Sequence, residues 1–201
     1  GKGSFDITMG QLSGADTNGT TLTDAQAMII SLTGVDLFVG VGTSVTVGSD
    51  YATSALNDGS LGFGVTGADL DLVTLTDLNG TLLDATDDTS YLGLELSFAQ
   101  AGLVGLGDLL EFTAFDTLVQ LNQVSAGATA PNQAPAKLDW SSFVTADLIL
   151  PVFTLDHNTD VHLEGDVVFG ALGLVAGKGS FDITMGQLSG ADTNGTTLTD
   201  A

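Results

Sequence analysis

The stretch MIISLTGVDLFV, residues 28–39, alternates apolar and other side chains, a pattern typical of a β-strand with one buried face. The alternation changes phase at Thr33-Gly34. One extra residue turns every later side chain to the opposite face, unless a bulge or corner absorbs it. The stretch therefore predicts a long, bent strand. Its apolar residues are Met28, Ile30 and Leu32 before the change, and Val35, Leu37 and Val39 after it.

The same change of phase recurs along the chain. It is centred at Gly67 within 61–72 and at Gln100 within 92–103, so the first three centres are 33 residues apart. This spacing indicates a sub-repeat of long bent strands joined by turns. The series predicts an all-β fold, either β-solenoid-like or a large curved antiparallel sheet or sandwich. Two further changes of phase lie at Gly10-Gln11 and at Gly170-Ala171.

The two ends of the chain carry one sequence. Residues 1–25 recur without change as residues 177–201, which gives a period of 177 − 1 = 176 residues. Identity over this length indicates recent or homogenised tandem duplication. We therefore expect residues 1–176 to form one repeat unit and 177–201 to begin the next identical unit. Within the unit, the Pro/Ala-rich stretch 124–137 is expected to be a flexible connector or a strap across the surface.

The composition is strongly acidic, with 25 Asp and Glu against three lysines, no arginine and a net charge of −22. Such a chain repels nucleic acid and anionic membrane surfaces, whose binding requires Lys and Arg. A hydrophobic content of 43% argues against disorder. Cysteine is absent, which excludes disulfides and thiolate zinc sites. No apolar run is long enough to span a bilayer, so we expect no membrane insertion.

Turn signals separate the apolar runs. Asn18-Gly19 and Asn79-Gly80 are dipeptides that favour a type I′ hairpin turn, in which both central residues have positive φ. Both are followed by Thr, which also creates the N-glycosylation sequence. Because hairpins independently require Asn-Gly, the turn interpretation is preferred.

Two groups of polar residues are candidate metal ligands. In the strand predicted around 156–166, Asp160, His162 and Glu164 lie on one face. Val161, Leu163 and Val167 are expected to point inward on the other. These three side chains suit a divalent metal, or form an ordinary solvated face. Loop carboxylates are better suited to Ca²⁺, the one cofactor considered, or bond their own turns. The loop candidates are Asp84, Asp87 and Asp88, and Asp16 and Asp24.

No catalytic residues are identified. The chain has no Arg, no Cys and two His, and it lacks a phosphate-binding loop, a nucleophile elbow and an HExxH sequence. The usual active-site arrangements cannot be assembled from this inventory, so we expect a protein that is not an enzyme.

Four stretches resemble units of giant, repetitive bacterial extracellular surface proteins of the adhesin-like, RTX-neighbour kind. This resemblance implies a long extracellular array at the bacterial cell surface, without a specific ligand. The glycine-aspartate nonapeptide of RTX calcium rolls is absent. The stretches are AMIISLTGVDLFVGVG (27–42), GFGVTGADLDLV (62–73), LDWSSF (138–143) and GKGSFDITMGQLSG (177–190).

Two functions fit the sequence. The first is a structural repeat of an extracellular filament, stalk or surface-layer-like fibre, with identical repeats as partners. The second is an adhesin repeat that binds carbohydrate or a partner surface, which would call for exposed aromatic residues; Trp140 is expected in the core instead. For the first function, an open strand edge is a natural joint. The apolar residues expected at that joint are Phe5, Ile7 and Met9 and their copies Phe181, Ile183 and Met185.

Overall fold

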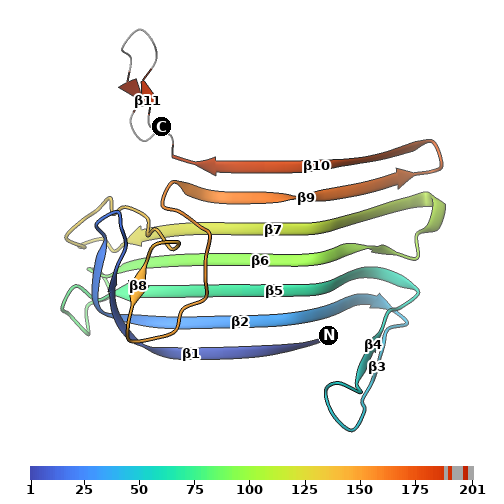
Figure 1. Cartoon of the computed structure of the whole chain (residues 1–201), viewed down its shortest axis with the longest axis horizontal. Coiled ribbons are helices and arrows are strands. Elements are labelled where there is room, and N and C mark those ends of the chain that lie inside the picture. The colour runs from blue at the N-terminus through green and yellow to red at the C-terminus, as the bar shows by residue number, and fades with distance from the viewer. Residues whose placement is uncertain (188–189, 192–196, 199–201) are drawn as a thin grey trace.

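The computed structural model shows an all-β chain built on one large antiparallel sheet, and it describes residues 1–187, 190–191 and 197–198 (Figure 1). The sheet has eight strands in the order β10-β9-β7-β6-β5-β2-β1-β8. Of the two predicted architectures, the described residues therefore form the large antiparallel sheet, and they contain no solenoid coil. No helix in this part of the chain has the length and hydropathy needed to cross a membrane.

Seven long strands follow one another through the sheet as an up-and-down meander. They are β1 (Lys2–Ala15), β2 (Thr21–Val41), β5 (Leu61–Asp77), β6 (Thr89–Val104), β7 (Leu110–Ala126), β9 (Thr159–Ala171) and β10 (Val175–Gly186). The short elements are β3 (Ser44–Thr46), β4 (Ala55–Asn57), the 3₁₀ turn η1 (Gly107–Leu109), β8 (Val144–Thr145), β11 (Gly190–Ala191) and β12 (Thr197–Leu198). Hairpins β3–β4 and β11–β12 stand outside the main sheet.

Bulges occur where the phase of the sequence pattern changes. Gly34 in β2 and Gly67 in β5 have φ of +59° and +61°, values that suit glycine, and the β2–β5 register shifts on both sides of Val35. Opposite Gly67, β6 changes phase near Gln100 without a register shift, because both strands have their extra residue at the same level. A fourth bulge, absent from the sequence prediction, lies in β7 at Asp116, with φ +45°.

These bulges form a line across adjacent strands. The 33-residue spacing therefore corresponds to the path length from one bulge to the bulge at the same level of the next strand. Two predicted bulges were wrong: β1 pairs regularly with β2 through Gly10 and Gln11, and β9 pairs regularly with β10 up to Ala171. In β1 the phase changes because Leu12 turns to the other face and is buried there.

One face of the sheet carries no charged side chain on its paired strand positions. Residues directly opposite each other in a sheet share a face. One row across all seven long strands is Ile7, Ile30, Leu72, Leu94, Leu121, Val161 and Met185. The next row is Phe5, Leu32, Leu70, Leu96, Val119, Leu163 and Ile183. We call this surface the uncharged face.

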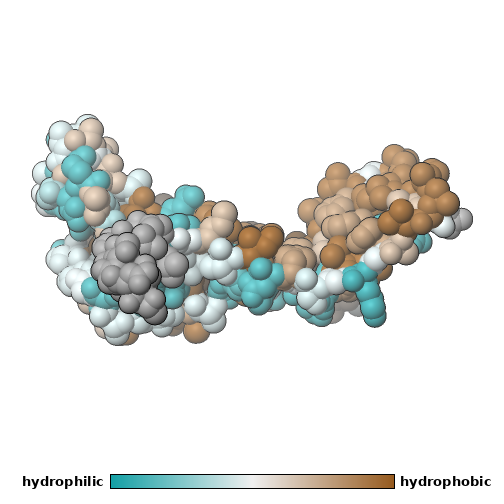
Figure 2. All heavy atoms as spheres, turned by 90° about the horizontal axis from the view of Figure 1, so that it is seen from above, coloured by the Kyte–Doolittle hydropathy of each residue, from teal (hydrophilic) through white to brown (hydrophobic). Residues whose placement is uncertain are grey.

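Beyond the bulges, the same face continues without charge. The row nearest the bulges is Leu37, Val65, Ala101, Ala114, Val167 and Gly179. Each bulge accommodates its extra residue, so that the apolar side chains stay on one side. Figure 2 shows hydrophobic residues, in brown, gathered at the right-hand end of the sheet, where β9 and β10 are joined.

The opposite face is crossed by residues 127–158, which we call the strap. The strap leaves β7, crosses the sheet, adds β8 to the outer edge of β1 and returns to β9 (Figure 1). Residues 124–126 of the Pro/Ala-rich stretch end β7, and the remainder opens the strap, with Ala130 and Lys137 buried. We call the side of the sheet that it crosses the strap face.

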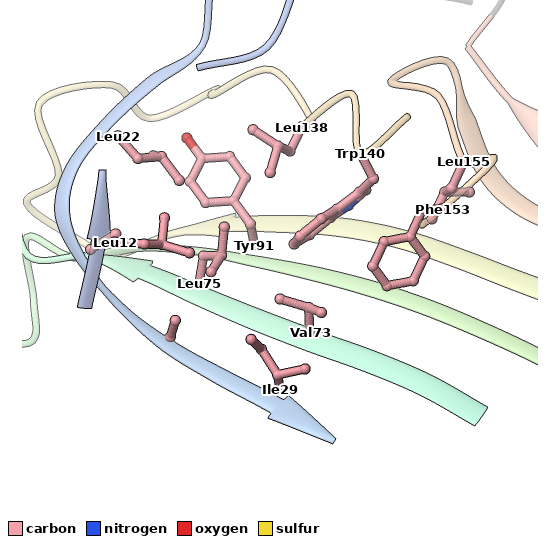
Figure 3. Close-up of a cluster of buried hydrophobic side chains, with 12 residues drawn as sticks. Leu12, Leu22, Ile29, Val73, Leu75, Tyr91, Leu138, Trp140, Phe153 and Leu155 are labelled. Carbon is pink, nitrogen blue, oxygen red and sulfur yellow. The ribbon is translucent and has the colours of Figure 1, made fainter. Parts of the chain in front are cut away.

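The hydrophobic core lies between the strap and the sheet (Figure 3). Trp140 packs on Phe153, with ring centroids 5.5 Å apart, and its indole N–H donates to Oδ1 of buried Asn122 at 3.1 Å. Asn122 in turn donates to the carbonyls of Leu138 and Asp156 at 2.9 and 2.8 Å, and so joins both arms of the strap to β7. The core residues are Leu12, Leu22, Ala25, Ala27, Ile29, Val73, Leu75, Tyr91, Leu138, Trp140, Phe153 and Leu155.

The position of the core corrects one expectation. Val161, Leu163 and Val167 were expected to point into the interior, but they belong to the uncharged face. The larger side chains of that face are half-buried or exposed, so no described segment covers it. The sequence pattern separates the two faces correctly but does not show which of them the strap covers.

The two Asn-Gly turns differ. Asn79 and Gly80 both have positive φ, of +47° and +83°, as a type I′ turn requires. At the other turn only Gly19 has positive φ, so the prediction for Asn18 was wrong. There the Asp16 carboxylate accepts the N–H groups of Asn18 and Thr20 and holds a different turn.

We predict that Gly93→Ala destabilises the chain by about 1–3 kcal/mol, because overpacking a filled core displaces its neighbours. A Cβ at Gly93 would lie 2.6 Å from Cε2 of Trp140. Gly64→Ala is the matched control, since its Cβ would be 3.5 Å from Phe38, an ordinary contact. Urea unfolding measures both free energies. Equal losses would show that the strap does not rest on Gly93.

Candidate functional site

The predicted calcium loop does not gather its carboxylates into one ligand group. Asp84 accepts the hydroxyl and N–H of Thr86 at 2.6 and 3.1 Å, and these bonds lower the pKa of Asp84. Both carboxylate oxygens of Asp87 lie within 2.9 Å of the hydroxyl of Thr81. Asp88 keeps one buried oxygen without a hydrogen-bond partner. Asp84 and Asp87 are therefore engaged within the loop itself.

The other two predicted calcium ligands, Asp16 and Asp24, have different environments. Asp16 is buried, and its Oδ1 accepts the N–H groups of Asn18 and Thr20 at 3.0 and 2.8 Å. Its Oδ2 accepts the N–H of Asp139 in the strap at 2.9 Å. Asp24 is exposed and has φ +50°. Asp16 is therefore a structural tie between the β1–β2 turn and the strap.

Asp160 is separated from its predicted partners. It forms an ion pair with Lys137, a buried lysine at the start of the strap, whose ammonium also donates to the carbonyl of Asn158. The desolvated ammonium needs a negative partner, so this pair anchors the strap to β9. His162 and Glu164 lie further along the same face of β9.

Among the described residues, one group of three side chains is arranged as a metal could require: His162, Glu164 and Asp182, with ligand atoms within 4.8 Å of one another. Glu164 and Asp182 are directly opposite on β9 and β10, and like charges so placed destabilise a sheet. The His162 ring lies beside both, with its Nε2 3.2 Å from Asp182 and 3.9 Å from Glu164.

The side chain of Gln120 fixes the orientation of the His162 imidazole through the other ring nitrogen, Nδ1. Nε2 of Gln120 donates to the Glu95 carboxylate at 2.8 Å, so its amide oxygen faces Nδ1 of His162, 2.9 Å away. Nδ1 therefore carries the proton of this bond. Nε2 of His162 faces the two carboxylates, where it can share a divalent cation with them.

The sequence alone missed Asp182, because it lies far from His162 along the chain. The repeat contained a signal for it: Asp182 is the copy of Asp6 (182 − 176 = 6). Asp6 sits in β1, where its contact is with the Thr8 hydroxyl at 3.1 Å. The His162 cluster therefore joins β9 to a strand whose sequence is the same as that of β1.

The six residues expected at a joint lie on the two opposite margins of the sheet. Phe5, Ile7 and Met9 are on β1, and their copies are on β10. Among the described strands, β10 has β9 as its single neighbour, and β1 has β2 on one side and β8 at Gly14 and Ala15 on the other. The outer edges of β10 and of most of β1 are therefore open. The copies on β10 are Phe181, Ile183 and Met185.

Comparison of the chain with protein-family models, curated proteins and solved structures finds no match.

We predict that Asp16→Asn lowers the free energy of unfolding by about 1–3 kcal/mol, because the amide has one accepting oxygen and its NH2 group would face a backbone N–H that now donates to Asp16. Asp24→Asn is the control, expected to change it by less than about 0.5 kcal/mol, since Asn tolerates positive φ. Thermal and urea unfolding measure both variants. Equal effects would contradict the structural role of Asp16.

Proposed function

We propose that this chain is a structural repeat of a bacterial extracellular filament, stalk or surface-layer-like fibre, whose units join by strand pairing. The observation that carries the proposal is that residues 1–10 and 177–186, identical in sequence, contribute β1 and β10 on opposite margins of one sheet. Its partners are identical neighbouring repeats. The acidic surface opposes binding to nucleic acid.

The direction of the two strands supports the joint. β1 and β10 are separated by six antiparallel steps, an even number, so they run the same way (Figure 1). Ile7 and Ile183 both point to the uncharged face. With the same direction and the same face, β1 pairs through one edge and β10 through the other. If the two copies are superposed, a single strand has both edges in use, and the sheet continues.

The two neighbours on the outer edge of such a strand do not collide. β9 pairs with β10 from Val175 to Gly186, and Gly186 is the copy of Gly10. β8 pairs with β1 at Gly14 and Ala15, beyond that point. A strand inside an array therefore has room for β9 of the preceding unit and β8 of its own unit on the same edge.

The stagger across one unit is small. The row that starts at Phe5 on β1 ends at Ile183 on β10, which is the copy of Ile7 (183 − 176 = 7). The register therefore advances by two residues per unit, or roughly 7 Å along the strands. An even advance keeps every side chain on its own face. The adhesin alternative has less support, because Trp140 is buried in the core.

The test compares the chain with a two-unit protein, in which residues 1–176 precede a second copy of the whole chain. The two-unit protein contains GKGSFDITMG three times, so Thr8→Ser in the first unit and Ser180→Thr in the second unit give the three peptides different masses. We predict that amide exchange in the second copy of GKGSFDITMG slows at least about tenfold relative to β10 of the single chain, because its open edge becomes paired.

The first strand of the two-unit protein is the internal control and keeps the exchange rate of β1. If the second copy exchanges as fast as β10 does in the single chain, units do not join by strand pairing and the proposal fails.

A further inference from the structure

We propose that the uncharged face is a docking surface for a second copy of this chain, so that two sheets pack face to face with their strap faces outward. The inference rests on the segregation of charge between the two faces of the long strands. It does not depend on the edge joint, because the face is present in a single unit.

The uncharged face is broad and continuous. Two of its rows cross all seven long strands with an apolar side chain at every position. With strands ~4.8 Å apart and a rise of ~3.3 Å per residue, seven strands of this length cover roughly 1,500 Å². A stable complex needs roughly 800 Å² from each partner. The face therefore has enough area for a specific sheet-to-sheet interface.

Its side chains are too accessible for an isolated surface. Phe5 and Met9 are each 75% exposed, and Val39 is 64% exposed. Single exposed apolar residues are normal, but a contiguous apolar surface of this size marks an interaction site. The core under the strap lies on the other side of the sheet and does not shield it.

The charge distribution favours a like partner. The neighbouring row on the strap face contains three carboxylates, Asp6, Asp71 and Glu95, and the imidazole of His162. With a net charge of −22, two copies repel each other wherever acidic side chains meet. The uncharged face is the surface through which they can approach without placing such residues in contact.

Face-to-face packing of two chains is expected to stop at two layers of sheet. The outer surface of each sheet carries the strap and the acidic rows, which repel a third sheet. Two antiparallel sheets packed about 10 Å apart through apolar faces form a sandwich, a frequent solution for sheets with one apolar face. The expected product is therefore a pair of chains and not an open stack.

Sedimentation velocity of the full chain over a range of concentrations tests the proposal. We expect a dimer for the unmodified chain and a monomer for Leu94→Lys, which places a charge in the middle of the face. Gln100→Lys is the matched control on the same strand, since Gln100 pairs with Phe115, next to Asp166 on the strap face. It should remain dimeric.

Circular dichroism establishes whether each variant is folded. If Leu94→Lys does not fold, Thr74→Lys introduces the charge at a position of the same face that is already polar and is expected to give the monomer. A chain that is monomeric throughout the range overturns the proposal. So does binding of the monomer to phosphatidylcholine vesicles, which would make lipid the occupant.

Edge joining gives a different result. Association through β1 and β10 would persist in Leu94→Lys and would continue beyond a pair. Failure of the face-to-face proposal can therefore be distinguished from failure of the edge joint.

Discussion

The whole structure depends on keeping apolar side chains on one side of strands that are too long to remain regular. β2, β5, β6 and β7 each accommodate one extra residue at the same level of the sheet, near Gly34, Gly67, Gln100 and Asp116. If one strand lacked its bulge, half of its side chains would change face relative to its neighbours. The rows on either side of the bulges remain apolar because the four strands change phase together.

The strap performs the task that a second sheet or a layer of helices performs in other folds. A single sheet buries little apolar area by itself, and the closed core here comes from residues that lie between β7 and β9 in the sequence. Trp140 fits against Gly93, and buried Asn122 satisfies the indole and two strap carbonyls. The polar groups of Trp140 and Asn122 are thereby paired within the core, which avoids the penalty of an unsatisfied donor at these positions.

Local periodicity was sufficient to predict long strands and three of the bulges. It failed at Asp116, because a bulge there uses a non-glycine residue with positive φ, and at Leu12, whose change of phase marks entry into the core. Ile29 and Ile30 are adjacent and point to opposite faces of β2, so both faces carry apolar side chains. The sequence therefore did not show which face the strap covers. Asp182 was missed as a neighbour of His162, because the sequence pattern did not establish that β9 pairs with a copy of β1.

The segregation of charge also bears on the register in which β9 pairs with the copy of β1. In the observed β9–β10 register, Asp182 lies opposite Glu164, with His162 between them, while Ile183 lies on the uncharged face. A slip by one residue would move Asp182 and Lys178 to the uncharged face and bring Ile183 to the acidic one. A slip by two residues would keep the faces but remove Asp182 from its present position beside the imidazole. The apolar rows therefore select the correct face, and the contact of Asp182 with His162 distinguishes the observed register from the others that preserve it.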